Sequence, residues 1–128
     1  MKFAPVLSLG IALSTSTTAF SQDAVSGAAV FRKCIACHVA DEKTNKIGPH
    51  LGDVIGRTAG TVPDFSYSDA MKSAGKSGLL WDDATLSEYL AAPKAKVPGT
   101  KMAFAGLKKS EDIQNVIAYL KSISELPQ

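Results

Sequence analysis

Two cysteines and a histidine lie within five residues of one another, in the stretch FRKCIACHVA at residues 31–40. Cys34 and Cys37 are the two cysteines of the chain, and His38 is one of its two histidines. Thiols and an imidazole this close can form a disulfide, a redox-active dithiol, part of a metal site or an attachment site for haem. Their spacing and the rest of the chain decide between these possibilities.

The spacing is that of the C-x-x-C-H pattern, the attachment signature of c-type haem. On a helical turn Cys34 and Cys37 share one face, so both sulfurs can bond one edge of a porphyrin. His38 follows directly and can place an imidazole nitrogen on the iron. We therefore predict one covalently attached haem c whose iron is bound by His38.

The other chemistries fit less well. A thioredoxin-like dithiol would need a βαβ context, and no strand-like alternation is found in the sequence. A structural zinc site would need four ligands, and among the usual donors only His50 remains. A disulfide stays compatible with export to an oxidising compartment.

The sixth position of the iron is open on spacing alone. Candidates are His50, Met71, Met102, a lysine or no protein ligand. A ligand on the opposite face must come from a distant segment, which favours Met102 over the near neighbour His50. Met102 follows a Pro-Gly turn that can present its thioether, although a lone methionine usually fills a core.

The composition of the chain further limits the classes of protein to which it can belong. Residues 1–21 are typical of a secretory signal peptide, with Lys2, an apolar run and small residues before Gln22. That run is too short to span a bilayer. Residues 22–128 then form one small domain, and the formal net charge of +2 gives no case for nucleic acid.

Periodicity predicts an all-α protein with long connections. The predicted helices are Val25–Cys37, Ser68–Ala74, Asp83–Ala92 stopped by Pro93, and a C-terminal helix capped by Ser110. The last has an apolar face made of Ile113, Val116, Ile117, Leu120 and Ile123. The long loop at about residues 39–66 suggests a chain that surrounds a large ligand.

In this context the chain resembles the class I cytochromes c, in particular the bacterial cytochrome c2 and mitochondrial cytochrome c branch. The resemblance runs from Gly27 to Lys121, and its markers appear in the family's order. They are Cys34-Ile35-Ala36-Cys37-His38, Gly48-Pro49, Gly56-Arg57, Phe65-Ser66-Tyr67, Trp81, Leu86-Ser87-Glu88-Tyr89-Leu90, Pro98-Gly99-Thr100-Lys101-Met102-Ala103-Phe104 and Ala118-Tyr119-Leu120.

The resemblance implies the small class I cytochrome c fold, with crossing N- and C-terminal helices around one haem and Met102 as the second axial ligand. It places the Pro49 carbonyl on His38, and Gly27, Phe31 and Tyr119 at the helix crossing. The residues it puts around the haem are Pro49, Arg57, Tyr67, Trp81, Tyr89 and Thr100. Tyr89 would lie near the methionine sulfur. Near a haem propionate would lie Arg57, Tyr67, Trp81 and Thr100.

Three features depart from the mitochondrial pattern. The segment from Tyr67 to Trp81 is longer by about one helical turn. Met71 and His50 both stand where asparagine is more usual. We expect His50 to lie on the surface or behind the iron ligands rather than to bind iron itself.

The function implied is that of a soluble, monomeric periplasmic one-electron carrier. Expected partners are a bc1-type complex or a dehydrogenase as electron donor, and a terminal oxidase or a photosynthetic reaction centre as acceptor. The alternatives are a haem enzyme of peroxidase-like or gas-binding type and a fixed subunit of a larger complex.

Basic residues near the haem motif and Met102 predict docking of acidic partners. Five lysines and no acid lie between Tyr89 and Ser110, and Lys33 precedes the first cysteine. A positive surface of this kind steers association and makes its rate sensitive to salt. The predicted docking residues are Lys33, Lys94, Lys96, Lys101, Lys108 and Lys109.

Overall fold

The computed structural model describes Met1 and residues 23–124, and its regular structure is helical. The helices are α1 (Ala24–Phe31), α2 (Asp69–Lys76), α3 (Asp83–Ala91), α4 (Pro93–Lys96) and α5 (Ser110–Ser124). Within these residues the strand-like pairing is limited to one isolated bridge between Thr58 and Leu80. The all-α prediction is confirmed, whereas the predicted signal peptide at residues 1–21 lies outside the described residues.

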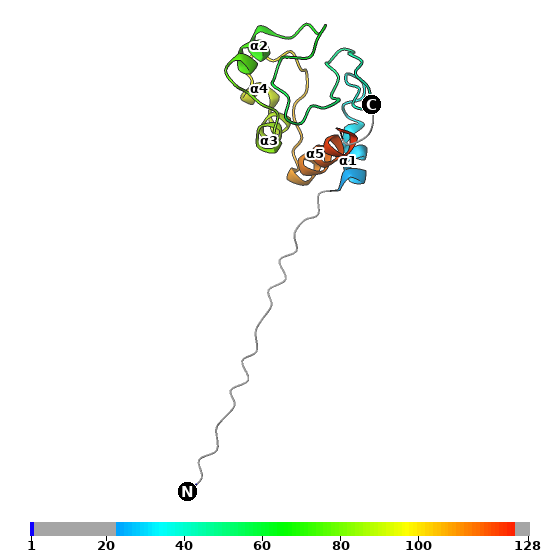
Figure 1. Cartoon of the computed structure of the whole chain (residues 1–128), viewed down its shortest axis with the longest axis vertical. Coiled ribbons are helices and arrows are strands. Elements are labelled where there is room, and N and C mark those ends of the chain that lie inside the picture. Colours follow the sequence, from blue (N-terminus) through cyan, green and yellow to red (C-terminus); the bar gives the residue numbers. More distant parts are fainter. Residues whose placement is uncertain (2–22, 125–128) are drawn as a thin grey trace.

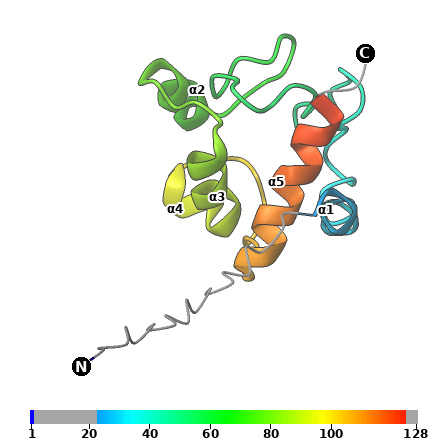
Figure 2. The same ribbon diagram turned by 60° about the horizontal axis from the view of Figure 1, so that its bottom comes forward.

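The first and last helices cross in direct contact (Figures 1 and 2). The crossing is close because Gly27 has no side chain: a Cβ there would lie 1.9 Å from the carbonyl oxygen of Asn115. Next to it the rings of Phe31 and Tyr119 pack with their centroids 5.3 Å apart. The predicted roles of Gly27, Phe31 and Tyr119 are confirmed.

The first helix is shorter than predicted. The Asp23 side chain caps it by accepting a hydrogen bond from the Val25 amide, and it ends at Phe31 rather than Cys37. Beyond Phe31 the amides of Arg32, Lys33 and Cys34 bond carbonyls three residues back instead of four. This tighter winding ends the α-helix and starts a separate turn that carries the cysteines.

The C-terminal helix has the predicted apolar face, because Ile113, Val116, Ile117, Leu120 and Ile123 are all buried. Its predicted cap is wrong by one position. Ser110 is already helical, and the Lys109 carbonyl accepts the hydrogen bond from the Ile113 amide. Lys109 therefore occupies the capping position.

The helices α2, α3 and α4 are shorter than α5 and lie on the side of the molecule opposite α1 (Figure 1). Ser68 caps α2, which extends two residues beyond the predicted end. Asp82 and Thr85 form a capping box at the start of α3. Pro93 ends α3 as predicted but also begins α4, since proline fits the first turn of a helix.

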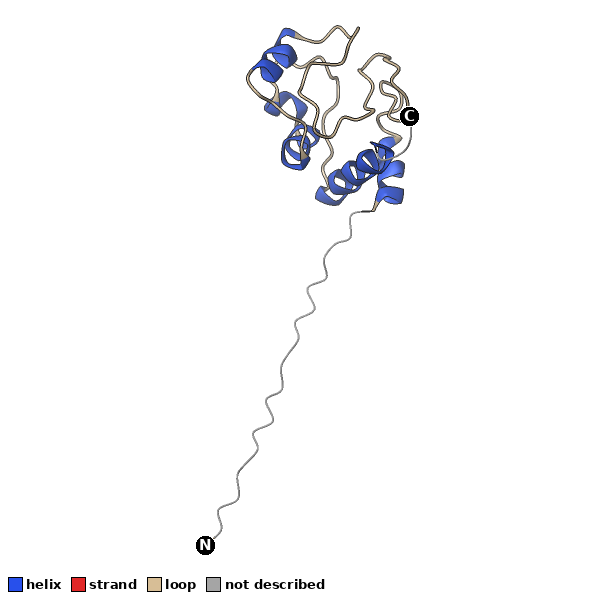
Figure 3. Cartoon of the chain, in the orientation of Figure 1, coloured by secondary structure: helices blue, strands red, loops and turns tan. Residues whose placement is uncertain are grey.

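Outside the helices, most of residues 23–124 form loops (Figure 3). Backbone hydrogen bonds between loop segments stabilise their conformation. The Gly56 amide donates to Trp81 and the Trp81 amide donates to Arg57, at 2.8 and 2.9 Å. The Leu51 amide donates to Val39 at 2.8 Å. These bonds fix irregular backbone beside the cysteine-bearing turn.

Candidate functional site

The two cysteines and the histidine share one turn after α1. The amides of Cys37 and His38 both donate to the Cys34 carbonyl, at 3.1 and 2.9 Å. Both thiols are half-buried and are not bonded to each other. Burial raises the pKa of the Cys34 thiol. A reactive dithiol needs a lowered pKa, so this environment disfavours that possibility.

His38 is held in one orientation by the loop beside it. Its Nδ1 lies 2.7 Å from the carbonyl oxygen of Pro49. A carbonyl can only accept, so Nδ1 carries the proton and the lone pair of the neutral ring is on Nε2. Burial, with smaller effects from Arg57 and Lys46, lowers the pKa of His38 and outweighs the opposing effect of Pro49. The neutral imidazole is the form that binds metals.

Gly48 completes this arrangement in a way that the sequence did not predict. A Cβ at Gly48 would lie 2.4 Å from Cε1 of His38, and all three nearest atoms belong to that ring. The Gly48 amide also donates to the Cys37 carbonyl at 2.8 Å. The pattern Gly48-Pro49 was visible, but the need for glycine depends on a contact between segments ten residues apart.

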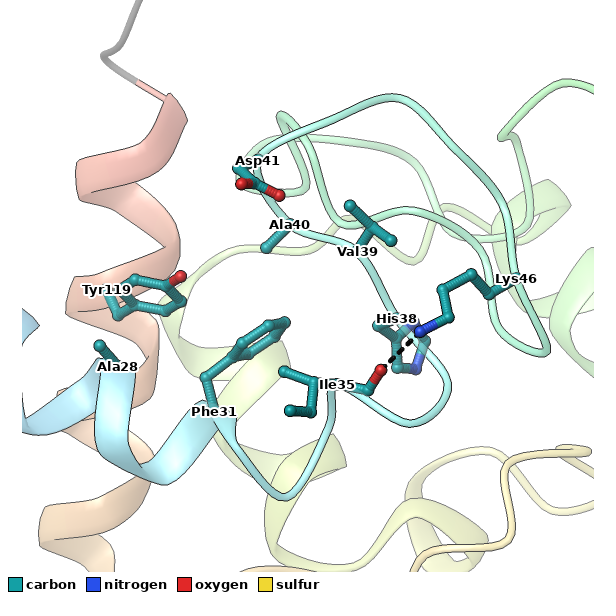
Figure 4. Close-up of a pocket in the computed structure, with 9 residues that line it drawn as sticks. All are labelled: Ala28, Phe31, Ile35, His38, Val39, Ala40, Asp41, Lys46 and Tyr119. Carbon is teal, nitrogen blue, oxygen red and sulfur yellow. Dashed lines mark hydrogen bonds between the residues drawn. The ribbon is translucent and has the colours of Figure 1, made fainter.

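A second contact ties the same loop to the cysteine turn from outside. Figure 4 shows the Lys46 ammonium donating to the Ile35 carbonyl, at 2.7 Å. These two residues and His38 line an open pocket of about 340 Å³, whose opposite wall comes from Phe31 and Tyr119. The loop that contains Lys46, Gly48 and Pro49 therefore contacts the cysteine-bearing turn at Ile35 as well as at Cys37 and His38.

Met102 lies in the loop between α4 and α5, where it is half-buried and packs against the core. Its amide is 3.4 Å from the Thr100 hydroxyl, which lies 2.8 Å from the hydroxyl of Tyr89. Tyr89 is buried, and its ring packs on Trp81 with centroids 5.0 Å apart. The structure therefore links Trp81, Tyr89 and Thr100 to the backbone of Met102.

Arg57 and Tyr67 form a second polar group. The Arg57 guanidinium donates to the Gly52 carbonyl at 3.2 Å, and the Tyr67 hydroxyl accepts from the Val62 amide at 3.1 Å. Burial is the main cause that lowers the pKa of Arg57 and raises that of Tyr67. The Arg57 carbonyl also accepts a hydrogen bond from the Trp81 amide. Tyr67 lies close enough to Arg57 for each to affect the pKa of the other.

The residues present fit a haem. His38 offers an oriented nitrogen and Met102 a thioether, and the absence of a side chain at Gly48 leaves the imidazole free to keep its position. Several apolar side chains pack on the core but remain half-buried: Leu51, Ile55, Leu79, Leu90 and Phe104. A porphyrin can cover apolar surface of this kind.

Comparisons with known proteins agree with this geometry. The sequence model of the family "Cytochrome c" matches residues 24–124. The chain belongs to the cytochrome c family. It is 56% identical to a cytochrome c2 of Afifella marina over 98 residues, covering 76% of this chain and 79% of that one. A cytochrome c2 of Rhodomicrobium vannielii is 48% identical over 122 residues, covering 94% and 95%.

A solved structure gives the same result. Cytochrome cH from Methylobacterium extorquens matches with a TM-score of 0.72 and 46% identity, over 78% of this chain and 98% of that one. The protein is thus a class I c-type cytochrome with the small all-α fold of that class. It is an electron-transfer protein rather than an enzyme, and its cofactor is one covalently bound haem c with iron.

Of the two locations expected for His50, the surface is wrong. Only 9% of the residue is exposed, and its Nδ1 is buried without a hydrogen-bond partner. Burial is the main cause that lowers the pKa of His50, with Arg57 and Lys43 adding to it and Asp53 opposing it. The other departure, Met71, is also buried.

Asn45 is a structural residue that the sequence did not reveal. Its side-chain oxygen accepts from the His50 amide, and its side-chain nitrogen donates to the Pro63 carbonyl, both at 3.0 Å. It therefore ties the segment that orients His38 to the loop before Tyr67. An asparagine in a polar loop gives no sequence signal of such a bridge.

The predicted docking lysines are not equivalent. Lys33, Lys94, Lys101, Lys108 and Lys109 are exposed. Lys96 is partly covered and forms an ion pair with Glu88, so its charge is compensated within the protein. Lys108 is exposed but donates to the Ala105 carbonyl at 3.1 Å, which places its ammonium beside the chain that follows Met102.

Proposed function

We propose that this cytochrome is a soluble periplasmic shuttle that carries single electrons between membrane redox complexes. Cys34 and Cys37 would hold the haem through thioether bonds, and His38 and Met102 would bind its iron from opposite faces. The observation that carries this proposal is the 2.7 Å contact between Nδ1 of His38 and the Pro49 carbonyl oxygen. This contact leaves the lone pair of His38 on Nε2, where it can bind the iron.

Haem supplies an iron that gains and loses one electron. The surrounding residues would determine how easily it does so. His38, made a better donor by Pro49, would supply a nitrogen ligand to the iron, and Met102 would supply a soft thioether sulfur. Burial and the thioether both favour the reduced form. Arg57, Tyr67 and Trp81 would offer donors to a propionate, whose buried charge needs them.

Mass spectrometry and an absorption spectrum of the purified protein test these assignments together. We expect a mass that begins at Gln22 and includes one haem, and a ferric spectrum with the methionine-to-iron charge-transfer band. Met102→Ala should abolish the band, whereas Met71→Ala should retain it. A ferric spectrum without the band would favour a haem enzyme, and an uncleaved N-terminus would favour a fixed subunit.

The proposed location and partners follow from the sequence and from surface charge. No helix among the described residues is long and apolar enough to cross a membrane. We propose that a signal peptide ending at residue 21 directs export, and that the protein works as a monomer. A bc1-type complex, a terminal oxidase, a reaction centre or a dehydrogenase would exchange electrons with it.

Docking would use the exposed lysines around the loop that carries Met102. Within residues 23–124 none of Lys94, Lys101, Lys108 and Lys109 forms an ion pair with a carboxylate. Lys101 is close enough to Asp69 to help lower its pKa. Lys33 adds a charge next to Cys34. Acidic partners would be attracted to this surface in brief, salt-sensitive encounters.

A further inference from the structure

One lysine outside the proposed docking surface is held against the cysteine-bearing turn. The Lys46 ammonium donates to the Ile35 carbonyl at 2.7 Å, inside the C-x-x-C-H motif (Figure 4). Within residues 23–124 this ammonium forms no ion pair with a carboxylate. Asp41 lines the same pocket but lies on the side of Tyr119, away from Lys46 (Figure 4). The charge of Lys46 is therefore fixed in place and uncompensated.

The backbone of the same loop also restrains Lys46. Its amide donates to the Gly48 carbonyl at 3.0 Å, and the Gly48 amide donates in turn to the Cys37 carbonyl at 2.8 Å. Gly48 itself lies against the ring of His38. Lys46 is thus tied to the cysteine-bearing turn through its ammonium and, by way of Gly48, through its backbone.

The Lys46 ammonium lies within electrostatic reach of His38. Burial is the main cause that lowers the pKa of His38, and the charges of Arg57 and Lys46 lower it further. Like charges repel, so a cation beside this ring opposes a second positive charge there. An iron bound to Nε2 carries one more positive charge when it is oxidised than when it is reduced. Lys46 should oppose that charge as well.

We propose that the fixed charge of Lys46 favours the reduced haem and so raises the reduction potential of this cytochrome. The inference rests on the proposed function, since it requires His38 to bind the haem iron. Arg57 is a second cation near His38, but its proposed partner is a propionate, whose negative charge would offset it. Lys46 is exposed, so solvent screens part of its charge and the effect should be modest.

Substitutions at Lys46 can change its charge in steps. Lys46→Gln removes the charge but keeps a donor for the Ile35 carbonyl, whereas Lys46→Met removes both. Lys46→Glu reverses the charge, and Lys46→Arg keeps the charge and the donors. Spectroelectrochemical titration of the haem-loaded protein at low ionic strength, where exposed charges are least screened, measures the potential of each variant.

We expect the reduction potential to follow the charge at Lys46. Lys46→Gln and Lys46→Met should each lower the equilibrium constant for reduction by about two- to threefold, as expected for one partly screened charge. This factor corresponds to about 18–28 mV for a one-electron couple. Lys46→Glu should produce about twice that shift, because it changes the charge by two units. Lys46→Arg should match the parent protein.

Lys43→Met is the matched control, because it removes a positive charge from the same loop. The Lys43 ammonium lies beside Asp53, at 3.5 Å, and not at the cysteine-bearing turn. Its removal should therefore lower the potential less than the removal of Lys46. The methionine-to-iron band and the proton NMR shifts of the ferric haem methyl groups report whether each variant keeps the axial ligands in their orientation.

Three outcomes would overturn the proposal. A potential that does not follow the charge would do so, as would a potential that Lys46→Met lowers but Lys46→Gln leaves unchanged, because the hydrogen bond would then be the cause. An unchanged potential with slower electron transfer to an acidic partner would assign Lys46 to docking instead. A missing methionine-to-iron band in the parent protein would contradict Met102 as a ligand, whereas the charge series would still decide the role of Lys46.

Discussion

At the scale of single residues, the site depends on how closely loop backbone approaches the ring of His38. Pro49 restrains Nδ1 by a hydrogen bond, while Gly48 lies against the carbon and nitrogen atoms of the same ring. The first contact selects the tautomer and the second limits tilt. An imidazole restrained in this way does not have to be ordered when it binds a metal.

Gly48→Ala should therefore damage the site. The added methyl would lie 2.4 Å from Cε1 of His38, so the ring or the loop must move, at a cost of about 1–3 kcal/mol in the free energy of unfolding. Guanidinium unfolding of the haem-loaded protein measures this cost. Gly52→Ala is the control, since its Cβ would make only ordinary contacts, the nearest at 3.5 Å. Equal losses in the two variants would contradict the explanation.

His50 should make the stability depend on pH. Its pKa is lowered in the folded protein and has its ordinary value of about 6.5 in the unfolded chain. As the pH falls through that ordinary value, the unfolded chain binds the proton first, so the free energy of unfolding decreases until the folded pKa is reached. The stabilising contribution of His50 to the free energy of unfolding is therefore complete at pH values above the ordinary pKa of histidine and is lost as the pH falls below it.

His50→Asn should flatten this dependence. Denaturant unfolding of the haem-loaded variant, measured at intervals from about pH 7 to about pH 5, should show a smaller decrease than the parent protein. Asp53, Arg57 and Lys43, the charges around His50, are unchanged in the variant, so the difference between the two curves isolates His50. Parallel curves would contradict this account.

At the scale of elements, the pairing of α1 and α5 is the main helix–helix contact, and α3 with α4 forms a second group joined to α5. Lys121 of α5 and Asp83 of α3 make an ion pair at 2.6 Å. Both side chains are more than a third exposed, so this pair contributes little. Apolar packing and close backbone approach hold the helices together.

Gly27→Ala should separate α1 from α5. The new methyl would lie 1.9 Å from a backbone oxygen of Asn115, which cannot rotate away as a side chain could. We expect a loss of about 3 kcal/mol, larger than the roughly 1 kcal/mol gained from the better helix propensity of alanine. Thermal unfolding followed by circular dichroism measures it. Val25→Ala, at an exposed position of the same helix, should change stability by less than about 0.5 kcal/mol.

The sequence predicted the helices better than the loops. Periodic apolar residues identified α5 and its buried face, and the segments of α2 and α3 were located to within two residues at each end, the second from the stop at Pro93. The early end of α1 at Phe31 was missed because nothing in the local sequence forbids a helix through Cys37. In the site, the C-x-x-C-H spacing showed where His38 would lie, but Gly48 and Asn45 act through contacts between loops, which no local pattern encodes.

At the scale of the whole molecule, basic residues are concentrated in one stretch of the sequence despite a formal net charge of only +2. Five lysines and no acid lie between Tyr89 and Ser110, while the acidic pairs Asp41-Glu42, Asp82-Asp83 and Glu111-Asp112 lie outside that stretch. A charge asymmetry orients an approaching partner before contact, which increases productive encounters without strong binding.

The second-order rate of electron transfer with an acidic partner should fall as ionic strength rises. Lys94→Gln should lower the rate at low salt more than Lys96→Gln does, because Glu88 already compensates Lys96. Stopped-flow measurement at several salt concentrations tests both statements. A rate that does not depend on salt would remove the electrostatic docking model, and equal effects of the two substitutions would remove the role assigned to Glu88.

The crossing of α1 and α5 also affects the order in which the chain can fold during synthesis. Because the partner of the first helix is the last fifteen-residue helix, no N-terminal fragment contains a complete core. Contacts between distant parts of a chain form late, since a long loop must close first. We therefore expect the core to be completed only when α5 is present, which would leave Cys34 and Cys37 accessible for the proposed attachment of haem.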